Sequence, residues 1–398
     1  MTNRAHLLGP RWDAWRGSWE GSRCLINRGA AWHLEDDGRE CCSWPDLRSA
    51  LLDVWPKRRV RDSSPWAVGW IGYEETARLA GGLPCRSEAD AAPPGLLVLE
   101  PQRSESALDL DDVTPESPEY GRRWSLDAAQ FRDHVENVRQ RIAAGKVYQV
   151  NLCRRLTVEG WTGALDALAA AAAVGGIPDY LASVKYDEGE LVCASMELLL
   201  QRRGERLETR PIKGTRPRGV SPEDDRKLAV DLENDPKERA ELAMIVDLER
   251  NDLGRISEIG SVHVADPGSV YSYAAVHHRV ARVVGRLRAG VEWWEALAAM
   301  APGGSVTGCP KLAAMSVITE LEPVPRGPFC GAFGVVAGNG DLELALPIRT
   351  AWRVGSRLEF AAGCGIVWES DPFSEEKESR LKVARWLEIV EGRHRAMA

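Results

Sequence analysis

The sequence predicts a mixed fold of the α+β class. Apolar segments of strand length are interspersed with helical patterns, and they do not follow the regular βαβ alternation of a doubly wound fold. Hydrophobic residues make up 44% of the chain and charged residues 28%, which is near the average for globular proteins. With 398 residues, the chain is long enough to bury a large core.

A polar, acidic stretch with two prolines, residues 101–120, is the best candidate for a linker. It divides the chain into a strand-rich N-terminal segment, 1–119, expected to pack on a main domain, 120–398. Within the first segment the apolar run WAVGWIGY, residues 66–73, is expected to form a strand.

The main domain is expected to open with a helix that Ser125 caps and that Gly145 ends. Its apolar residues keep a helical period at Phe131, Val135, Val138 and Ile142. A strand follows over residues 147–158. Residues 191–214 are expected to form two strands joined by a turn at Arg203 and Gly204.

A second helix is expected to begin at Pro236. Asp235 stands at the cap position and Glu238 lies three residues later, which is a capping-box pattern, and the helical pattern continues through Leu248. Glu238 and Glu241 are three residues apart, on a stripe otherwise suited to burial. Buried acids need partners, so this pair marks a candidate site.

The chain closes with a similar helix, expected from Pro372 to about Ile389. It also carries a pair of glutamates three residues apart, Glu375 and Glu378, followed by Lys382. Between the two helices we expect a helix over residues 312–323 and three strands with the sequences GAFGVVAG, LELALPIRTAW and LEFAAGCGIVW.

The two glutamate pairs suggest a site for a hard cation. Mg²⁺ takes oxygen ligands and commonly bridges a protein carboxylate to an anionic substrate. The alternative is that Glu375 and Glu378 are solvated and that Glu378 pairs with Lys382 four residues later. The spacing alone leaves both interpretations open.

Two glycine-rich segments provide backbone N–H groups that side chains do not cover. Gly363 and Gly365 lie between apolar runs, and the sequence GGSVTG, residues 303–308, precedes a predicted helix. Either segment is suited to an anion, and either is equally compatible with ordinary tight turns.

Lys213 lies between an isoleucine and a glycine at the end of an apolar strand. A lysine in such surroundings can have a lowered pKa and act as a nucleophile or base. The ordinary alternative is an ammonium group that reaches the surface.

The composition excludes several classes of function. A formal charge of −8 argues against nucleic acid or an anionic membrane as the main partner. The sequence shows neither a signal peptide nor a run of about 18 apolar residues, so we expect a cytoplasmic protein. The nine cysteines contain no C-x-x-C spacing, which gives no indication of a structural zinc site.

Six motifs in order resemble those of the chorismate-utilising enzymes: PIKGTRPRG, ELAMIVDLERNDLGRI, GGSVTGCPKLAAM, LEPVPRGPFCGAFG, IRT and GCGIVWESDP. This family includes anthranilate synthase, aminodeoxychorismate synthase, isochorismate synthase and salicylate synthase. The resemblance covers roughly residues 125–395. It implies large antiparallel sheets packed together with helices on the outside, and a chorismate-binding catalytic domain over residues 120–398.

The resemblance assigns roles to individual residues. It implies that Glu241 and Glu378 ligate magnesium, with Glu238 and Glu375 supporting the site. It implies a substrate pocket that holds the carboxylates of chorismate and is lined by Arg349, Gly363, Cys364, Gly365, Ser305, Thr307 and Phe329. Glu197 matches a family glutamate and is the candidate general acid or base, and His278 matches a histidine near the departing hydroxyl group.

Lys213 distinguishes between members of the family. Aminodeoxychorismate synthases carry this lysine, whereas anthranilate synthases carry alanine. The lysine is thought to attack C2 of chorismate, after which ammonia adds at C4 and expels it. The resemblance therefore implies amination of chorismate on the route to p-aminobenzoate and folate, with ammonia from a separate glutamine amidotransferase.

Three departures from the family pattern leave other interpretations open. Phe329 replaces a usual tyrosine, Met196 a proline beside Glu197, and Cys364 a glycine whose backbone cradle a Cβ would crowd if φ were positive. The alternatives are anthranilate synthase component I, isochorismate synthase, and a chorismate-binding subunit without catalytic activity.

Overall fold

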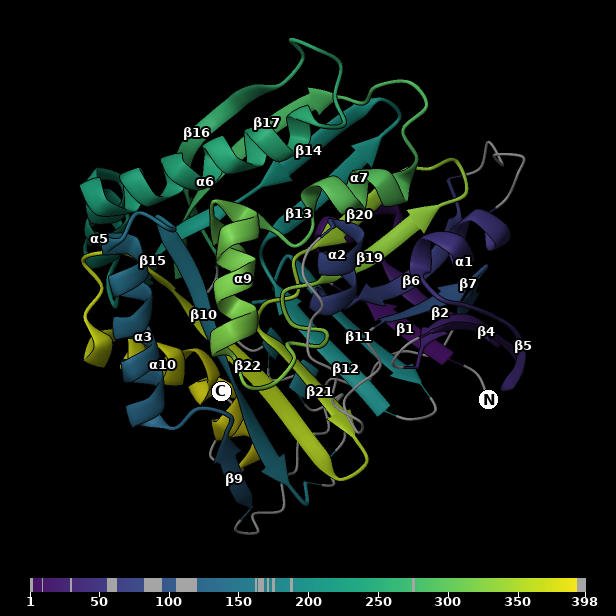
Figure 1. The fold of residues 1–398 in the computed structure, drawn as a ribbon, viewed down its shortest axis with the longest axis horizontal. Helices are drawn as coiled ribbons and strands as arrows, with labels where there is room; N and C mark the ends of the chain where they lie inside the picture. Colours follow the sequence, from purple (N-terminus) through teal and green to yellow (C-terminus); the bar gives the residue numbers. More distant parts are fainter. Residues whose placement is uncertain are drawn as a thin grey trace.

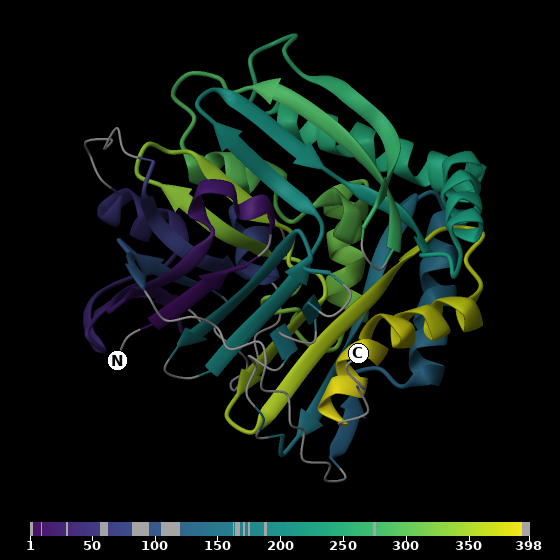
Figure 2. The same ribbon diagram turned by 180° about the vertical axis from the view of Figure 1, so that it is seen from behind.

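The computed structural model of the chain consists of two large sheets with helices around them (Figures 1 and 2). The α+β fold predicted from the sequence is confirmed. The structure describes the following residues: 3–8, 10–28, 31–55, 63–81, 95–104, 120–161, 163, 168–169, 172–173, 176–186, 189–273 and 276–391.

Within these residues the first sheet has ten strands and the second has twelve. Neighbouring strands run antiparallel throughout. In spatial order the first sheet is β18 (Gly308–Cys309), β10 (Gln149–Glu159), β22 (Arg357–Ile366), β21 (Thr350–Val354), β12 (Gly189–Ser195), β11 (Tyr180–Tyr186), β1 (Asn3–Leu7), β2 (Gly17–Gly21) and β8 (Gln102–Ser104), with β9 (Gly121–Trp124) beside β10.

The second sheet contains the strand of Lys213 and the strand that begins at Ala332. In spatial order it is β15 (Ile212–Pro217), β17 (Val276–Arg286), β14 (Arg206–Arg210), β13 (Leu198–Arg203), β20 (Leu342–Ala345), β19 (Ala332–Ala337), β6 (Pro65–Ile71), β7 (Gly95–Leu99), β3 (Arg23–Asn27), β4 (Trp32–Asp36) and β5 (Arg39–Trp44), with β16 (His263–Ser272) beside β17.

The helices lie around the sheets. They are η1 (Pro10–Trp15), α1 (Leu47–Val54), α2 (Tyr73–Leu79), α3 (Ala128–Ala143), α5 (Pro222–Asn234), α6 (Pro236–Gly254), α7 (Trp293–Met300), α8 (Gly304–Thr307), α9 (Lys311–Leu321) and α10 (Pro372–Val390). In Figure 1, α6 runs along the second sheet beside β16 and β17, whereas α3 and α10 lie together against the first sheet. Among the described helices none is both long and apolar enough to cross a membrane.

The N-terminal strands are part of both sheets. β1 pairs with β11 in the first sheet, and β6 pairs with β19 in the second. The larger hydrophobic core takes side chains from both sheets, among them the fully buried Tyr180 of β11 and Phe333 of β19, and it also contains Trp12 of the helix η1 (Pro10–Trp15). Of the predicted linker, residues 105–119 lie outside the described residues, so the boundary at 119 stays a prediction.

A second, smaller core lies between the first sheet and α10. There Phe360 of β22 stacks on Trp386, with 6.0 Å between the ring centroids. This contact fixes α10 against the strand that carries Gly363 and Gly365.

The predicted helix starts at Pro236 and Pro372 are confirmed. Asp235 accepts hydrogen bonds from two N–H groups of α6, and Asp371 accepts one from Ser374 in α10. The predicted cap at Ser125 is wrong. Asp127 caps α3, because the Ser125 hydroxyl accepts the N–H of Arg155 and so ties the chain to β10.

Residues 191–214 form parts of four strands instead of the expected two. The turn at Gly204 is confirmed, but the chain also leaves the first sheet after Ser195 and enters the second at Leu198. It makes the reverse crossing between Ala345 and Thr350. Glu197 lies on the first of these crossings and Arg349 on the second.

Candidate active site

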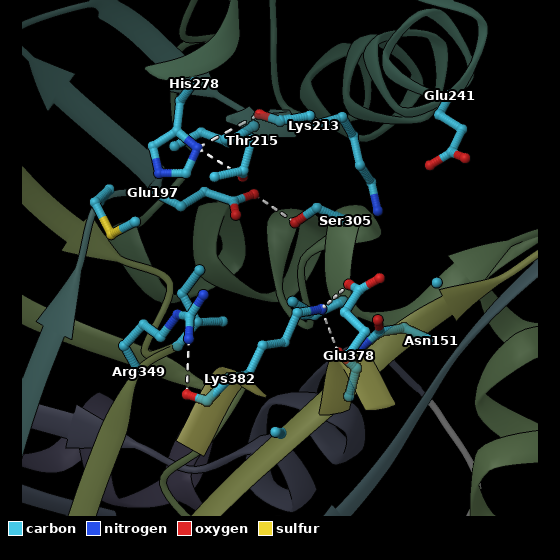
Figure 3. A pocket seen from close by; sticks show the side chains of 18 of the residues that line it. Asn151, Glu197, Lys213, Thr215, Glu241, His278, Ser305, Arg349, Glu378 and Lys382 are labelled. Atoms are coloured by element: carbon cyan, nitrogen blue, oxygen red, sulfur yellow. Dashed lines mark hydrogen bonds and ion pairs between the residues drawn. The ribbon is translucent and has the colours of Figure 1, made fainter. Parts of the chain in front are cut away.

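A cavity of about 540 Å³ lies beside the two crossings between the sheets. Most of the residues predicted for the site line it. From the sequence prediction these are Lys213, Glu197, His278, Arg349, Gly363, Gly365, Ser305, Phe329, Glu238, Glu241, Glu375 and Glu378. Figure 3 shows the labelled side chains among them directed toward one shared space.

Glu197 is buried at one wall of the cavity. Its Oε1 accepts the hydroxyl of Ser305 at 2.5 Å. Burial raises its pKa to about 7, although Ser305 and the nearby Lys213 oppose this shift. A carboxyl group that titrates near neutrality is suited to donate or accept a proton during turnover.

Lys213 lies on β15 and extends into the cavity. Burial lowers its pKa, and Glu241 and Glu197 partly offset that effect. No hydrogen bond or ion pair holds the ammonium group among the described residues. A Cβ at Gly365 would lie 3.3 Å from Lys213 Nζ, so glycine keeps the space beside this amine open.

His278 is held by the strand that carries Lys213. Its Nδ1 lies 2.9 Å from Thr215 Oγ1 and 3.4 Å from Gly214 O. Burial lowers its pKa to about 4, so the ring is neutral at pH 7. The buried Nε2 has no hydrogen-bond partner among the described residues and is available to a molecule in the cavity.

Arg349 stands at the second crossing between the sheets. Its φ of 51° is unusual for a residue with a Cβ, and its Nη1 donates to Lys382 O at 2.7 Å. The structure thus fixes the direction of a guanidinium group whose remaining N–H groups can bind a carboxylate.

The open edge of β22 forms a third wall of the cavity. Strand β21 pairs with β22 only as far as Phe360, whereas β10 pairs with it up to Ile366. From Ala361 onward β22 is therefore paired with a neighbouring strand on one side only. Gly363 and Gly365 lie on this edge, where a small residue leaves the backbone accessible to an anion.

The four glutamates come from two helices and meet at the same cavity. Glu238 and Glu241 belong to α6, and Glu375 and Glu378 belong to α10. Burial raises the pKa of Glu241 and of Glu375, and neighbouring glutamates add to the shift. Four carboxylates whose negative charges repel one another provide the oxygen ligands that a divalent cation such as Mg²⁺ prefers.

Glu378 already has a cationic partner. Lys382 Nζ lies 2.7 Å from Glu378 Oε1 and donates to Gly363 O at 2.7 Å. Although burial opposes the effect, the ammonium group lowers the pKa of Glu378. The pairing expected at this helical spacing is therefore present beside the cavity, where the Glu378 side chain is 54% exposed.

Two further residues at the site were missed by sequence reasoning. Asn151 of β10 lines the cavity. Gln149, two residues earlier, is fully buried behind Gly365, and both polar atoms of its amide lack a partner among the described residues. Gln149 and Asn151 are two residues apart, so the strand pattern of the sequence predicts that both lie on the same face of β10. The pattern alone does not indicate which face meets the cavity.

Two predicted residues are not among those that line the cavity. Thr307 is fully buried, and its hydroxyl donates to Gly303 O at 2.9 Å inside its own turn. The Cys364 thiol donates to Glu375 O at 3.3 Å and lies within 4.8 Å of the carboxylates of Glu375 and Glu378. Because Cys364 lies in regular strand without a positive φ, its Cβ does not crowd the backbone as the departure from glycine suggested.

Comparisons with known proteins identify the family. The chorismate binding enzyme family matches residues 97–388. Anthranilate synthase component 1 1 of Haloarcula marismortui is 39% identical over 359 residues, 79% of this chain and 73% of that protein. Aminodeoxychorismate synthase component 1 of Klebsiella aerogenes is 35% identical over 349 residues, 82% of this chain and 77% of that protein.

A second aminodeoxychorismate synthase component 1, from Bacillus subtilis, is 40% identical over 264 residues, 66% of this chain and 56% of that protein. Among solved structures, anthranilate synthase component I from Streptococcus pneumoniae superimposes with a TM-score of 0.79 and 25% identity, covering 96% of this chain and 92% of that one. The chain belongs to the family of chorismate-binding enzymes.

Proposed function

We propose that this chorismate-utilising enzyme replaces the C4 hydroxyl group of chorismate with an amino group and so produces 4-amino-4-deoxychorismate. The observation that carries the proposal is the Lys213 amine, which extends into the cavity without an ion pair and with a lowered pKa. This reaction needs a nucleophile from the protein, whereas formation of anthranilate does not.

In the proposed reaction, the uncharged Lys213 amine attacks C2 of the ring. A C2–N bond forms, the two conjugated ring double bonds both shift by one position, and the C4–O bond breaks. The hydroxyl group leaves as water after it receives a proton. Ammonia then attacks C4, both double bonds shift back, the C2–N bond breaks, and a proton is lost from the new amine. The sum is chorismate plus ammonia giving aminodeoxychorismate plus water.

Glu197 is the proposed proton donor for the leaving hydroxyl group. With a pKa of about 7 it is protonated in a large share of molecules at neutral pH, and Ser305 fixes its orientation. His278 is the proposed partner of the same hydroxyl group, which its neutral ring would bind through the unpaired Nε2.

Chorismate carries two carboxylates, and the site has two places for them. Arg349 provides a planar, oriented guanidinium group. The open edge of β22 at Gly363 and Gly365 provides backbone groups near the four glutamates.

Glu241 and Glu378 would hold Mg²⁺, with Glu238 and Glu375 beside them. A bound magnesium ion would neutralise a substrate carboxylate and orient it. Lys382 keeps Glu378 ionised for this purpose.

Ammonia comes from a separate glutamine amidotransferase in this proposal, and the enzyme acts in p-aminobenzoate formation in the cytoplasm. Two of the relatives above are named aminodeoxychorismate synthase component 1, which supports this assignment. The principal alternative is anthranilate synthesis, because other relatives of similar identity are named anthranilate synthase component 1.

Product identification tests the proposal. The purified chain is incubated with chorismate, magnesium and ammonium, and the products are separated by liquid chromatography and identified by mass spectrometry. We expect aminodeoxychorismate with ammonium and none with glutamine alone. Anthranilate with pyruvate, isochorismate, or bound but unconverted chorismate would each refute it.

A further inference from the structure

The short helix α8 carries Ser305 but has no cap of its own. Its cap position is Gly303, which has no side chain to accept the first free N–H groups. The N–H of Gly304 instead donates to Glu249 Oε1, on helix α6, at 3.1 Å. A side chain of α6 thus accepts an N–H group of α8 that a side chain at the cap position would otherwise accept.

Close packing supports this contact. Glu249 is 3% exposed and its second oxygen has no hydrogen-bond partner among the described residues. A Cβ at Gly304 would lie 3.2 Å from Glu249 Oε1 and 2.5 Å from Leu248 Cδ2. Only glycine allows α8 to lie this close to α6.

The other end of α8 is also held by a buried charged group. Arg326 donates to Val306 O at 2.8 Å, and its guanidinium group is itself held by Glu322 at 2.6 Å. Between these two contacts lies Ser305, whose hydroxyl reaches Glu197. The position of the Ser305 hydroxyl therefore depends on both ends of the helix.

We propose that Glu249 is a positioning residue that fixes α8 so that Ser305 holds Glu197 in its proton-donating orientation. Glu249 does not line the cavity, and its hydrogen bond to α8 is the one that it accepts from Gly304. The inference rests on the proposed function, because it assigns Glu249 to the same proton transfer.

Glutamine is the conservative replacement at this position. Burial raises the pKa of Glu249 to about 8, with Lys311 opposing and Asp252 and Glu197 adding to the shift. The group is therefore mostly uncharged at pH 7, and the amide oxygen of glutamine can accept the Gly304 N–H in the same way.

The test compares turnover of Glu249→Leu, Glu249→Asp and Glu249→Gln. Leucine removes the acceptor, and aspartate keeps the carboxyl group but shortens its reach by one methylene. We expect kcat to fall about tenfold in both, the effect of one lost hydrogen bond, with the KM for chorismate nearly unchanged. Glu249→Gln is expected to stay close to the parent chain, as is the control Asp247→Leu at an exposed position of α6.

A double substitution shows whether Glu249 acts through Ser305. Glu249→Leu combined with Ser305→Ala is expected to be no slower than Ser305→Ala alone. Three results would each overturn the inference. The first is a double variant whose loss of kcat is the product of the two single losses. The others are an unchanged kcat in Glu249→Leu and Glu249→Asp, and a loss of kcat in Glu249→Gln as large as in those two variants.

Hydrogen exchange at the amides of residues 303–307 provides a measurement without chorismate. Exchange is expected to be faster in Glu249→Leu and Glu249→Asp than in the parent chain and in Glu249→Gln. Equal exchange would overturn the inference even if the enzyme is active. A parent chain that consumes no chorismate, with faster exchange in the two variants, would refute the proposed function and leave the cap in place.

Discussion

Burial gives individual side chains of the cavity their proposed chemistry. It raises the pKa of Glu197 to about 7 and lowers the pKa of Lys213, so burial favours the carboxylic acid form of the first and the amine form of the second. Each group moves toward its uncharged form because water is largely excluded. This pairing of an acid and a nucleophile is what the proposed reaction requires.

The pH dependence of turnover tests the role of Glu197. Because its pKa is raised to about 7, the proton-donating form is present below that pH and is lost as pH rises through it. We expect kcat to decline above pH 7 in the parent chain. Glu197→Gln should lower kcat by about 100-fold or more and remove this decline, as steady-state rates between pH 5.5 and 9 would show. An unchanged profile would contradict the assignment.

Sequence reasoning identified most of the residues at the site, but it did not predict their surroundings. Lys382 shows the difference. Its pairing with Glu378 follows from helical spacing, whereas its bond to Gly363 O depends on how α10 packs on β22. Thr307 was predicted to line the pocket because it belongs to the GGSVTG motif, but its hydroxyl donates to Gly303 O within its own helical turn.

At the scale of elements, two helices of similar design supply the acidic cluster. Both α6 and α10 begin with Asp followed by Pro, and each carries two glutamates three residues apart. Caps and spacing are local properties, so the sequence predicted them. The meeting of the two pairs at one cavity depends on packing against different sheets, which no local pattern records.

Magnesium dependence tests this cluster. Glu241→Gln and Glu378→Gln should each raise the magnesium concentration that gives half-maximal turnover, by about 10- to 100-fold. The exposed Glu388→Gln on α10 serves as the control and should behave like the parent chain. Full activity of both cavity variants in the presence of a chelator would contradict a role in metal binding.

The two crossings between the sheets could not be predicted from the sequence, and the reason is physical. Residues 191–200 read LVCASMELLL, a nearly continuous apolar run with no glycine or proline to mark an end. The break falls at Met196 and Glu197, where Ser195 Oγ donates to Leu346 O and accepts the Glu197 N–H. These bonds join the two crossings, and they exist only in the folded molecule.

At the scale of the whole molecule, the N-terminal segment is built into both sheets. Strands β1 and β2 extend the first sheet beyond β11, and β6 covers the edge of β19 in the second. Trp12 of this segment packs on Tyr180 and Phe333 of the main domain. The division of the chain by composition therefore does not correspond to separate cores.

Removal of residues 1–119 tests this arrangement. The remaining chain would expose the edges of β11 and β19 and part of the larger core, so we expect it to aggregate or to lack cooperative unfolding. Size-exclusion chromatography and thermal denaturation followed by circular dichroism would show this. A soluble fragment with a sharp transition would mean that residues 120–398 form a domain of their own.

The central claim is that Lys213 makes a covalent bond to the substrate, and Lys213→Ala tests it most directly. Aminodeoxychorismate is measured by mass spectrometry with chorismate, magnesium and ammonium, beside a fluorescence titration that shows whether the variant still binds chorismate. The account predicts binding without formation of this product, because alanine has no amine to attack C2 of the ring. Aminodeoxychorismate formed by Lys213→Ala at a rate near that of the parent chain would contradict it.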